Sequence, residues 1–207
     1  MRMLSFPFRR FAGLCQLGCA ALCLAVPIAA PAADKFQLVD GTADLGVRAV
    51  RLQLAHELAA EISGVIRRIA APSAADQAML SNEIAAIDQL DNAAAVNMRA
   101  RQLYLSPRFQ EQRLRQTLQR VSEALRCAGE KGNSASREMT CWALAAFHLN
   151  DRSFFEESIA VLRQTGHVPR DGETSAGKWS SLPARFNLYG RAIQQRLVIP
   201  YLAGQLR

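Results

Sequence analysis

Apolar side chains recur at steps of three and four residues along most of the chain, beginning near residue 44. Between residues 44 and 71 this stripe consists of Val47, Val50, Leu54, Leu58, Ile62, Val65 and Ile69. Charged residues fall mainly on the opposite side, so the pattern predicts an amphipathic helix over this range. Pro72 is expected to end it, because proline lacks the amide proton that an interior helical position donates.

A second helical stripe follows from Ser73 to about Leu105. Ser73 is a residue type that caps helix N-termini. Asp91-Asn92 interrupts the stripe, and we expect the helix to bend there. Ser106-Pro107 marks a new start, since serine caps a helix and proline fits its first position. A third helix is therefore predicted from this point to Cys127.

Three shorter helices are predicted in the rest of the chain. The first covers about 137–149, and the second opens with a capping box at residues 153–156 and closes at Gly166. The last begins near Pro183, and Pro200 is expected to kink or end it.

No segment alternates polar and apolar residues over more than a few positions, so the sequence predicts no β-sheet. We therefore expect an all-α fold, a single helical bundle of about six helices over residues 44–207. Its first two helices are expected to form a long antiparallel hairpin, and residues 33–43 an exposed lead-in.

The first 32 residues have the pattern of a cleavable secretory signal peptide. Arg2, Arg9 and Arg10 form a positive start, residues 11–26 are mostly apolar, and an Ala-x-Ala site ends at Ala32. The alternative is an uncleaved membrane anchor, since the apolar run is just long enough to span a bilayer. We favour cleavage and residence in the periplasm, with no transmembrane span afterwards; full secretion and a membrane-anchored form are the alternatives.

The composition indicates a folded protein, because half of the 207 residues are hydrophobic. Without its first 32 residues the chain keeps 22 basic and 18 acidic residues, a net charge of +4. This weak positive charge, together with export, argues against nucleic acid as a partner.

Cleavage would also leave only two cysteines, Cys127 and Cys141, fourteen positions apart. In an oxidising compartment this pair predicts a disulfide bond between the third and fourth helices. The alternative is a redox pair. Such pairs usually have the form Cys-x-x-Cys, so we favour a structural bond.

Motifs for metal, cofactor or hydrolytic chemistry are not found in the sequence. His56-Glu57 begins like the zinc-protease motif, but Ala60 stands where its second histidine is needed. There is no Cys-x-x-Cys-His for covalent haem, no Gly-x-Ser-x-Gly and no glycine-rich phosphate loop. We therefore predict no catalytic residues, metal ligands or cofactor. The alternative of a site formed by residues that are distant in the sequence and meet only in the fold is kept.

Two groups of residues are candidate interaction surfaces. The third helix carries five arginines that flank its apolar seam, namely Arg108, Arg113, Arg115, Arg120 and Arg126. They suit an anionic partner such as a lipid headgroup or an acidic protein, and the alternative is an ordinary solvated flank. Lys178 and Trp179 lie in a polar loop. There the large aromatic side chain either marks a binding site or packs back on the core.

These observations favour a non-enzymatic exported protein that binds another macromolecule of the cell envelope, either a protein or an anionic component. The alternative is a ligand-binding or catalytic helical bundle whose site is assembled only in the fold. An apolar outer patch over a filled core favours the first hypothesis, whereas buried arginine and glutamate side chains lining a pocket favour the second.

Overall fold

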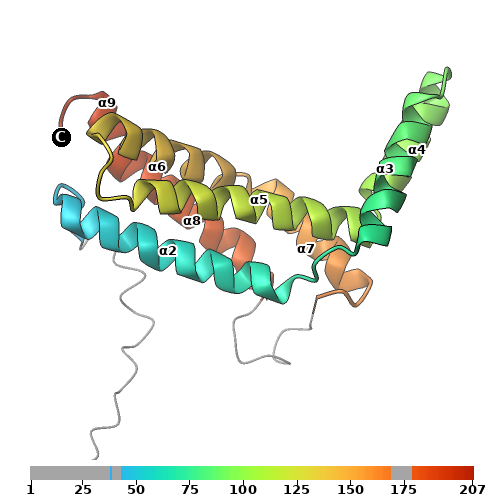
Figure 1. Ribbon diagram of the computed structural model, residues 1–207, viewed down its shortest axis with the longest axis horizontal. Helices are drawn as coiled ribbons and strands as arrows, with labels where there is room; N and C mark the ends of the chain where they lie inside the picture. Colours follow the sequence, from blue (N-terminus) through green and yellow to red (C-terminus); the bar gives the residue numbers. More distant parts are fainter. Residues whose placement is uncertain (1–37, 39–42, 169–178) are drawn as a thin grey trace, which may run out of the picture. The chain divides into compact units, whose positions relative to one another are not determined.

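The computed structural model describes Leu38, residues 43–168 and residues 179–207 (Figure 1). These residues form no strand and seven helices, when the continuous segments at 182–202 are counted as one helix. The predicted all-α fold, a helical bundle with one disulfide bond, is confirmed. The predicted signal peptide lies outside the described residues, as does the lead-in apart from Leu38 and Ala43.

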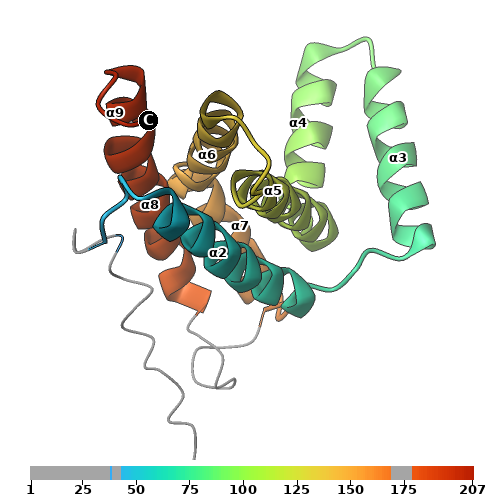
Figure 2. The same cartoon turned by 60° about the vertical axis from the view of Figure 1, so that its left-hand side comes forward.

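Helix α5 (Pro107–Ala128) packs against both α2 (Arg48–Arg68) and α6 (Ala135–Leu149) (Figures 1 and 2). Its predicted apolar seam is confirmed as the centre of the core. The seam residues are each at most 1% exposed, and they are Leu114, Leu118, Val121 and Leu125. The stripe of α2 faces this seam, so the two amphipathic helices bury each other's apolar side chains.

The C-terminal helices complete the bundle. Helix α7 (Arg152–Gln164) packs against α5 and α8 (Leu182–Ile193), and α8 also packs against α6. Gly190 permits the close approach of α8 to α6. A Cβ atom there would lie 2.6 Å from Asn150 Oδ1 and 3.0 Å from the Ala146 carbonyl oxygen.

The second predicted helix is in fact two. Helices α3 (Ala74–Asp88) and α4 (Ala93–Tyr104) pair mainly with each other, and α4 contacts α5 (Figure 2). The expected hairpin between the first two predicted helices therefore differs from the structure, in which α2 pairs with α5. The division into α3 and α4 has a local cause: Asn92 Oδ1 accepts hydrogen bonds from the amides of Ala94 and Ala95 and so caps a new helix.

Capping explains most helix starts. Ser73 forms a full capping box with Asp76, and Ser106 caps α5 ahead of Pro107, as the sequence predicts. The capping box predicted at residues 153–156 is wrong. Asp151 caps α7 two residues earlier, where its Oδ1 accepts from the Phe154 amide at 3.0 Å.

Gly166 ends one helix, whereas Pro200 is accommodated inside another. Gly166, at a positive φ of 76°, closes α7, and the His167 amide donates back to the Leu162 carbonyl at 2.8 Å. After a short 3₁₀ turn, η2 (Trp179–Ser181), helix α8 continues without a break through a π-helical segment, η3 (Gln194–Val198), into α9 (Ile199–Leu202). Pro200 lies just after the π segment. Widening the helix there accommodates a residue that cannot donate the usual bond.

The Cys127–Cys141 disulfide joins the end of α5 to α6, with 5.8 Å between the two Cα atoms. It closes the turn between the two helices that form the centre of the bundle. Within the described part of the chain, no helix combines the length and apolar character needed to cross a bilayer.

Candidate functional site

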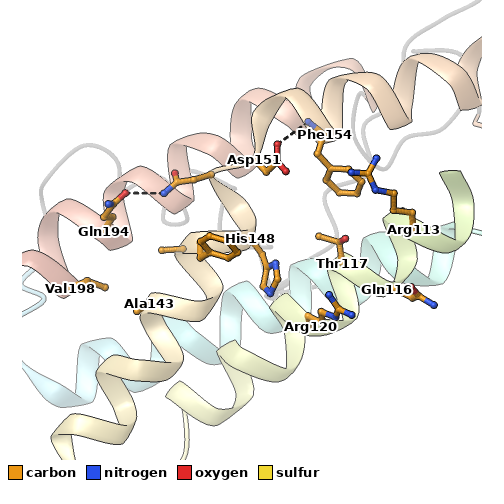
Figure 3. Close-up of a pocket in the computed structure, with 13 residues that line it drawn as sticks. Arg113, Gln116, Thr117, Arg120, Ala143, His148, Asp151, Phe154, Gln194 and Val198 are labelled. Atoms are coloured by element: carbon orange, nitrogen blue, oxygen red, sulfur yellow. Dashed lines mark hydrogen bonds between the residues drawn. The ribbon is translucent and has the colours of Figure 1, made fainter. Parts of the chain in front are cut away.

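A groove of about 730 Å³ lies on one side of the bundle, between α5, α6, the start of α7 and η3 (Figure 3). Its lining combines apolar, amide and cationic side chains. The residues that line it are Arg113, Gln116, Thr117, Arg120, Ala143, Ala146, Phe147, His148, Asn150, Asp151, Phe154, Gln194 and Val198. We refer to this feature below as the groove.

Helical spacing places the polar side of the groove. Arg113, Thr117 and Arg120 follow one another at steps of four and three on α5, so they share one face of that helix. The buried seam of α5 occupies the adjacent face. Ala143 and Phe147, four residues apart on α6, form the facing wall.

Arg113 is held in a fixed position at one end of the groove. Its guanidinium lies 4.4 Å from the ring centroid of Phe154 and 5.1 Å from that of Tyr104. Its Nη1 also donates to the Tyr104 hydroxyl at 2.8 Å, and this hydroxyl donates to Glu157 Oε2 at 2.5 Å. The charge of Arg113 is thus partly offset by Glu157.

Arg120 and His148 form the second polar part of the groove (Figure 3). Burial lowers the pKa of His148 below its ordinary value of 6.5, and the positive charge of Arg120 lowers it further. His148 is therefore predominantly neutral at neutral pH. Among the described residues, no hydrogen bond or ion pair engages the Arg120 guanidinium.

The rest of the groove contains apolar side chains and polar ones, some of which are already hydrogen-bonded. Phe147 is 73% exposed at its rim, whereas Phe154 is buried. Asn150 Nδ2 donates to Gln194 Oε1 at 2.9 Å, and Asp151 is engaged as the cap of α7 (Figure 3). This arrangement offers positive charge beside apolar surface, which is the chemistry of a binding groove.

In the described ranges, no three histidine, cysteine, aspartate or glutamate side chains come together as a candidate metal site. The groove itself contains one carboxylate, that of Asp151, and its capping bond to the Phe154 amide occupies one oxygen.

The five arginines predicted as an interaction surface do not share one face. Arg113 and Arg120 line the groove, but Arg115 donates to the carbonyls of Ile66 and Ile69 and so caps the end of α2. Arg108 forms an ion pair with Asp76 of α3, and Arg126 donates to Ser63 Oγ at 3.4 Å.

Trp179, also predicted as an interaction residue, is only 2% exposed and belongs to the core. The Arg68 guanidinium lies 5.7 Å from its ring centroid. The prediction of a surface role for Trp179 is therefore corrected: its large apolar area is buried, as in the alternative of a loop residue that packs back on the core. Lys178 lies outside the described residues.

A buried ion pair was missed at the sequence level. Arg51 and Glu138 are 1% and 0% exposed, and Arg51 Nε lies 2.6 Å from Glu138 Oε1. Arg51 also donates to the carbonyls of Leu45 and Gly46, and Arg48 donates to the second Glu138 oxygen at 3.1 Å. These bonds satisfy both charges and tie the start of α2 to α6, so the pair has a structural role.

The signal for this pair is present in the sequence. Arg51 lies three residues before Leu54 on the inner stripe of α2, and Glu138 lies four before Trp142 on that of α6. A charged residue at an inner position of an apolar stripe must be paired when it is buried, so two such positions predict a contact.

A second group of paired charges involves Glu61 of α2. Its carboxylate forms an ion pair with Arg185 and accepts from the Tyr189 hydroxyl at 3.3 Å. Burial and, next, the negative charge of Glu61 raise the pKa of Tyr189 above its ordinary value of 10.0. This group joins α2 to α8.

Comparisons of the chain with protein-family models, with curated protein sequences and with solved structures gave no match.

Proposed function

We propose that this chain is an exported, non-enzymatic interaction module of the cell envelope that binds another protein through the hairpin formed by α3 and α4. The hairpin is defined here as residues 73–105. The observation that carries this proposal is a set of five exposed apolar side chains in the hairpin. They are Met79 at 44%, Ile84 at 46%, Leu90 at 39%, Met98 at 62% and Leu105 at 51% exposure.

The hairpin has little core of its own. Leu80 is the one buried residue among all those of α3 and α4, both of which the structure describes in full. Helices of 15 and 12 residues are marginal in water unless they pack an apolar face. A protein partner that covers these side chains would supply the missing packing.

The charges of the hairpin indicate the chemistry of this partner. Helix α3 carries Asp76, Glu83 and Asp88 and no basic residue, while α4 carries Arg99 and Arg101 and no acidic residue. Asp76 and Glu83 are already paired with Arg108 and Arg99. A complementary surface therefore has apolar residues at its centre and charges opposite in sign to Asp88 and Arg101. We therefore infer a protein surface with an apolar centre as the occupant.

Export is supported by the N-terminal pattern of basic residues, apolar run and Ala-x-Ala site, and by the disulfide between Cys127 and Cys141. We infer cleavage after Ala32 and residence in the periplasm. Mass spectrometry of the chain recovered from its host tests this part. The expected mass starts at Ala33 and is two protons below that of the reduced chain, and an intact N-terminus would contradict cleavage.

Photo-cross-linking in the intact host tests the interaction. A photoreactive amino acid replaces Met98 in the hairpin or, as an exposed apolar control on the bundle, Leu188 of α8, which is 42% exposed. The probe at position 98 is expected to give one discrete product with a second protein. Adding Ile84→Glu to the Met98 probe chain is expected to abolish that product, because it places a charge among the exposed apolar side chains of the hairpin.

Equal labelling from positions 98 and 188, or a product that survives Ile84→Glu, would contradict the proposal. A product of twice the mass of the chain would also contradict a separate partner, and would identify a second copy of this chain as the occupant.

A further inference from the structure

We infer that the groove between α5, α6 and η3 is a binding site for an organic anion, a carboxylate or phosphate group carried on an apolar body. This site is separate from the hairpin and goes beyond the interaction proposed above.

The cationic part of the site is Arg120. In the described part of the chain its guanidinium has no hydrogen bond or ion-pair partner, whereas Arg113 is held by Tyr104 and Phe154. A guanidinium offers several donors in one plane, which match the oxygens of a carboxylate or phosphate. Arg120 is therefore free to bind the anion, whereas Arg113 is held in place and its charge is partly offset by Glu157.

The other charged groups of the groove do not compete for Arg120. They are His148, Asp151 and, beyond Tyr104, Glu157. His148 is predominantly neutral at neutral pH. Asp151 caps α7, and Figure 3 draws it beside Phe154 rather than beside Arg120. Glu157 is bonded to Tyr104 and balances Arg113.

The apolar body fits the facing wall of the groove, which is formed by Ala143, Phe147, Phe154 and Val198. Phe147 is 73% exposed, an unusual state for so large an apolar side chain, and a ligand in the groove would cover part of it. The volume of about 730 Å³ lies within the range of small-molecule sites, roughly 300–1,000 Å³.

His148 provides an internal reporter of the anion. The positive charge of Arg120 helps to lower its pKa, so an anion on Arg120 offsets that field and raises the pKa of His148. His56 and His167 do not line the groove and serve as controls, His167 being paired with Glu111 at 2.6 Å.

The experiment titrates the purified, disulfide-bonded chain with octanoate, octyl phosphate, 1-octanol and inorganic phosphate. It measures heat of binding and the NMR pKa of each histidine. Octanoate or octyl phosphate is expected to bind about tenfold more tightly than octanol, the ratio that one charge-assisted hydrogen bond supplies. Either anion should raise the pKa of His148 alone, and the stronger of the two identifies the head group.

Arg120→Gln is expected to remove the preference for the anions over octanol while leaving the chain folded, since the side chain is exposed. The matched control is Arg126→Gln, an exposed arginine of the same helix outside the groove, which is expected to bind as the wild type does.

Three results would overturn the inference: anions that bind no more tightly than octanol, full affinity in Arg120→Gln, or equal loss in Arg126→Gln. A His148 pKa that is no higher with a bound anion than with bound octanol would also do so. Equal binding of inorganic phosphate would contradict the role of the apolar wall.

Discussion

The bundle centre and the α3–α4 hairpin are both helical, but they bury their apolar residues to different extents. In α5 the seam residues Leu114, Leu118, Val121 and Leu125 are at most 1% exposed. In the hairpin, five large apolar side chains are between 39% and 62% exposed. The bundle buries its central seam, although Phe147 at 73% and Leu202 at 76% are exposed on its surface, whereas the two helices of the hairpin bury only Leu80.

The same contrast appears in the polar contacts. The bundle is cross-linked by the Cys127–Cys141 disulfide and by the buried Arg51–Glu138 pair. The hairpin is joined to α5 by the partly exposed Asp76–Arg108 pair and by Tyr104, which accepts hydrogen bonds from Arg113 and Gln110. Its own helices are joined by Glu83 with Arg99 at 3.0 Å. Exposed ion pairs contribute little to stability, so the hairpin should open while the bundle stays folded.

The largest expected effect on stability comes from a substitution that creates a cavity in the bundle. Phe155 is fully buried, and its ring centroid lies 5.0 Å from those of Phe154 and Phe186. Phe155→Ala is expected to lower the free energy of unfolding by about 4 kcal/mol, because it removes apolar contacts and leaves a void. Urea unfolding followed by circular dichroism measures the loss.

The matched change in the hairpin is Met98→Ala. Because Met98 is 62% exposed, this variant is expected to stay within about 0.5 kcal/mol of the wild type. A loss as large as that of Phe155→Ala would show that the hairpin contributes a core of its own and would break the comparison.

Removal of the disulfide has the next largest effect. The double variant Cys127→Ser, Cys141→Ser frees a segment with a sequence separation of 14. It is expected to lose about 3 kcal/mol, because the unfolded chain regains the entropy of an open loop. Thermal unfolding under non-reducing conditions measures the lower Tm. Binding through the hairpin at low temperature is expected to persist, and an unchanged Tm would contradict a stabilising bond.

A capping change in the hairpin is expected to act locally. Ser73 accepts from the Asp76 amide at 3.1 Å, and Asp76 Oδ2 accepts from the Ser73 amide at 3.2 Å. Ser73→Ala is expected to weaken α3 by about 1 kcal/mol. Faster amide exchange in α3 with an unchanged Tm of the bundle is the predicted result, and a lower Tm would mean that the two regions unfold together.

The smallest effect concerns His148, whose folded pKa is lowered by burial and by Arg120. As the pH falls below about 6.5, the unfolded chain takes up a proton at this residue before the folded chain does. His148 therefore lowers the free energy of unfolding as the pH falls. His148→Gln should show a smaller decrease in the urea midpoint between pH 7.5 and pH 5.5 than the wild type, and an equal decrease would exclude this contribution.

The sequence was sufficient for the helices and for the inner stripe of α5, because periodicity and caps such as Ser106-Pro107 are local signals. It did not reveal that Asn92 starts a new helix, since a capping residue and a bend have the same appearance in the sequence. Nor could it pair α2 with α5, because an apolar stripe does not specify which other stripe covers it.

The groove was only partly predictable for a related reason. Arg113 and Arg120 were identified as candidate binding residues, but Arg115 and Arg126 were assigned with them to one surface. The wheel of a single helix places all of these beside the apolar seam. Which of them face a neighbouring helix depends on where α2 and α6 pack, and that is a property of the tertiary fold.

The central claim is that the hairpin needs a covering partner whereas the bundle does not. Hydrogen exchange of the purified, disulfide-bonded chain, read by mass spectrometry at a concentration where it is monomeric, tests this claim most directly. We predict that amides of α3 and α4 exchange well before those of α5 and α6, through a local opening that leaves the bundle folded. Equal protection of the hairpin and the bundle would show that the hairpin is stable uncovered and would contradict the account.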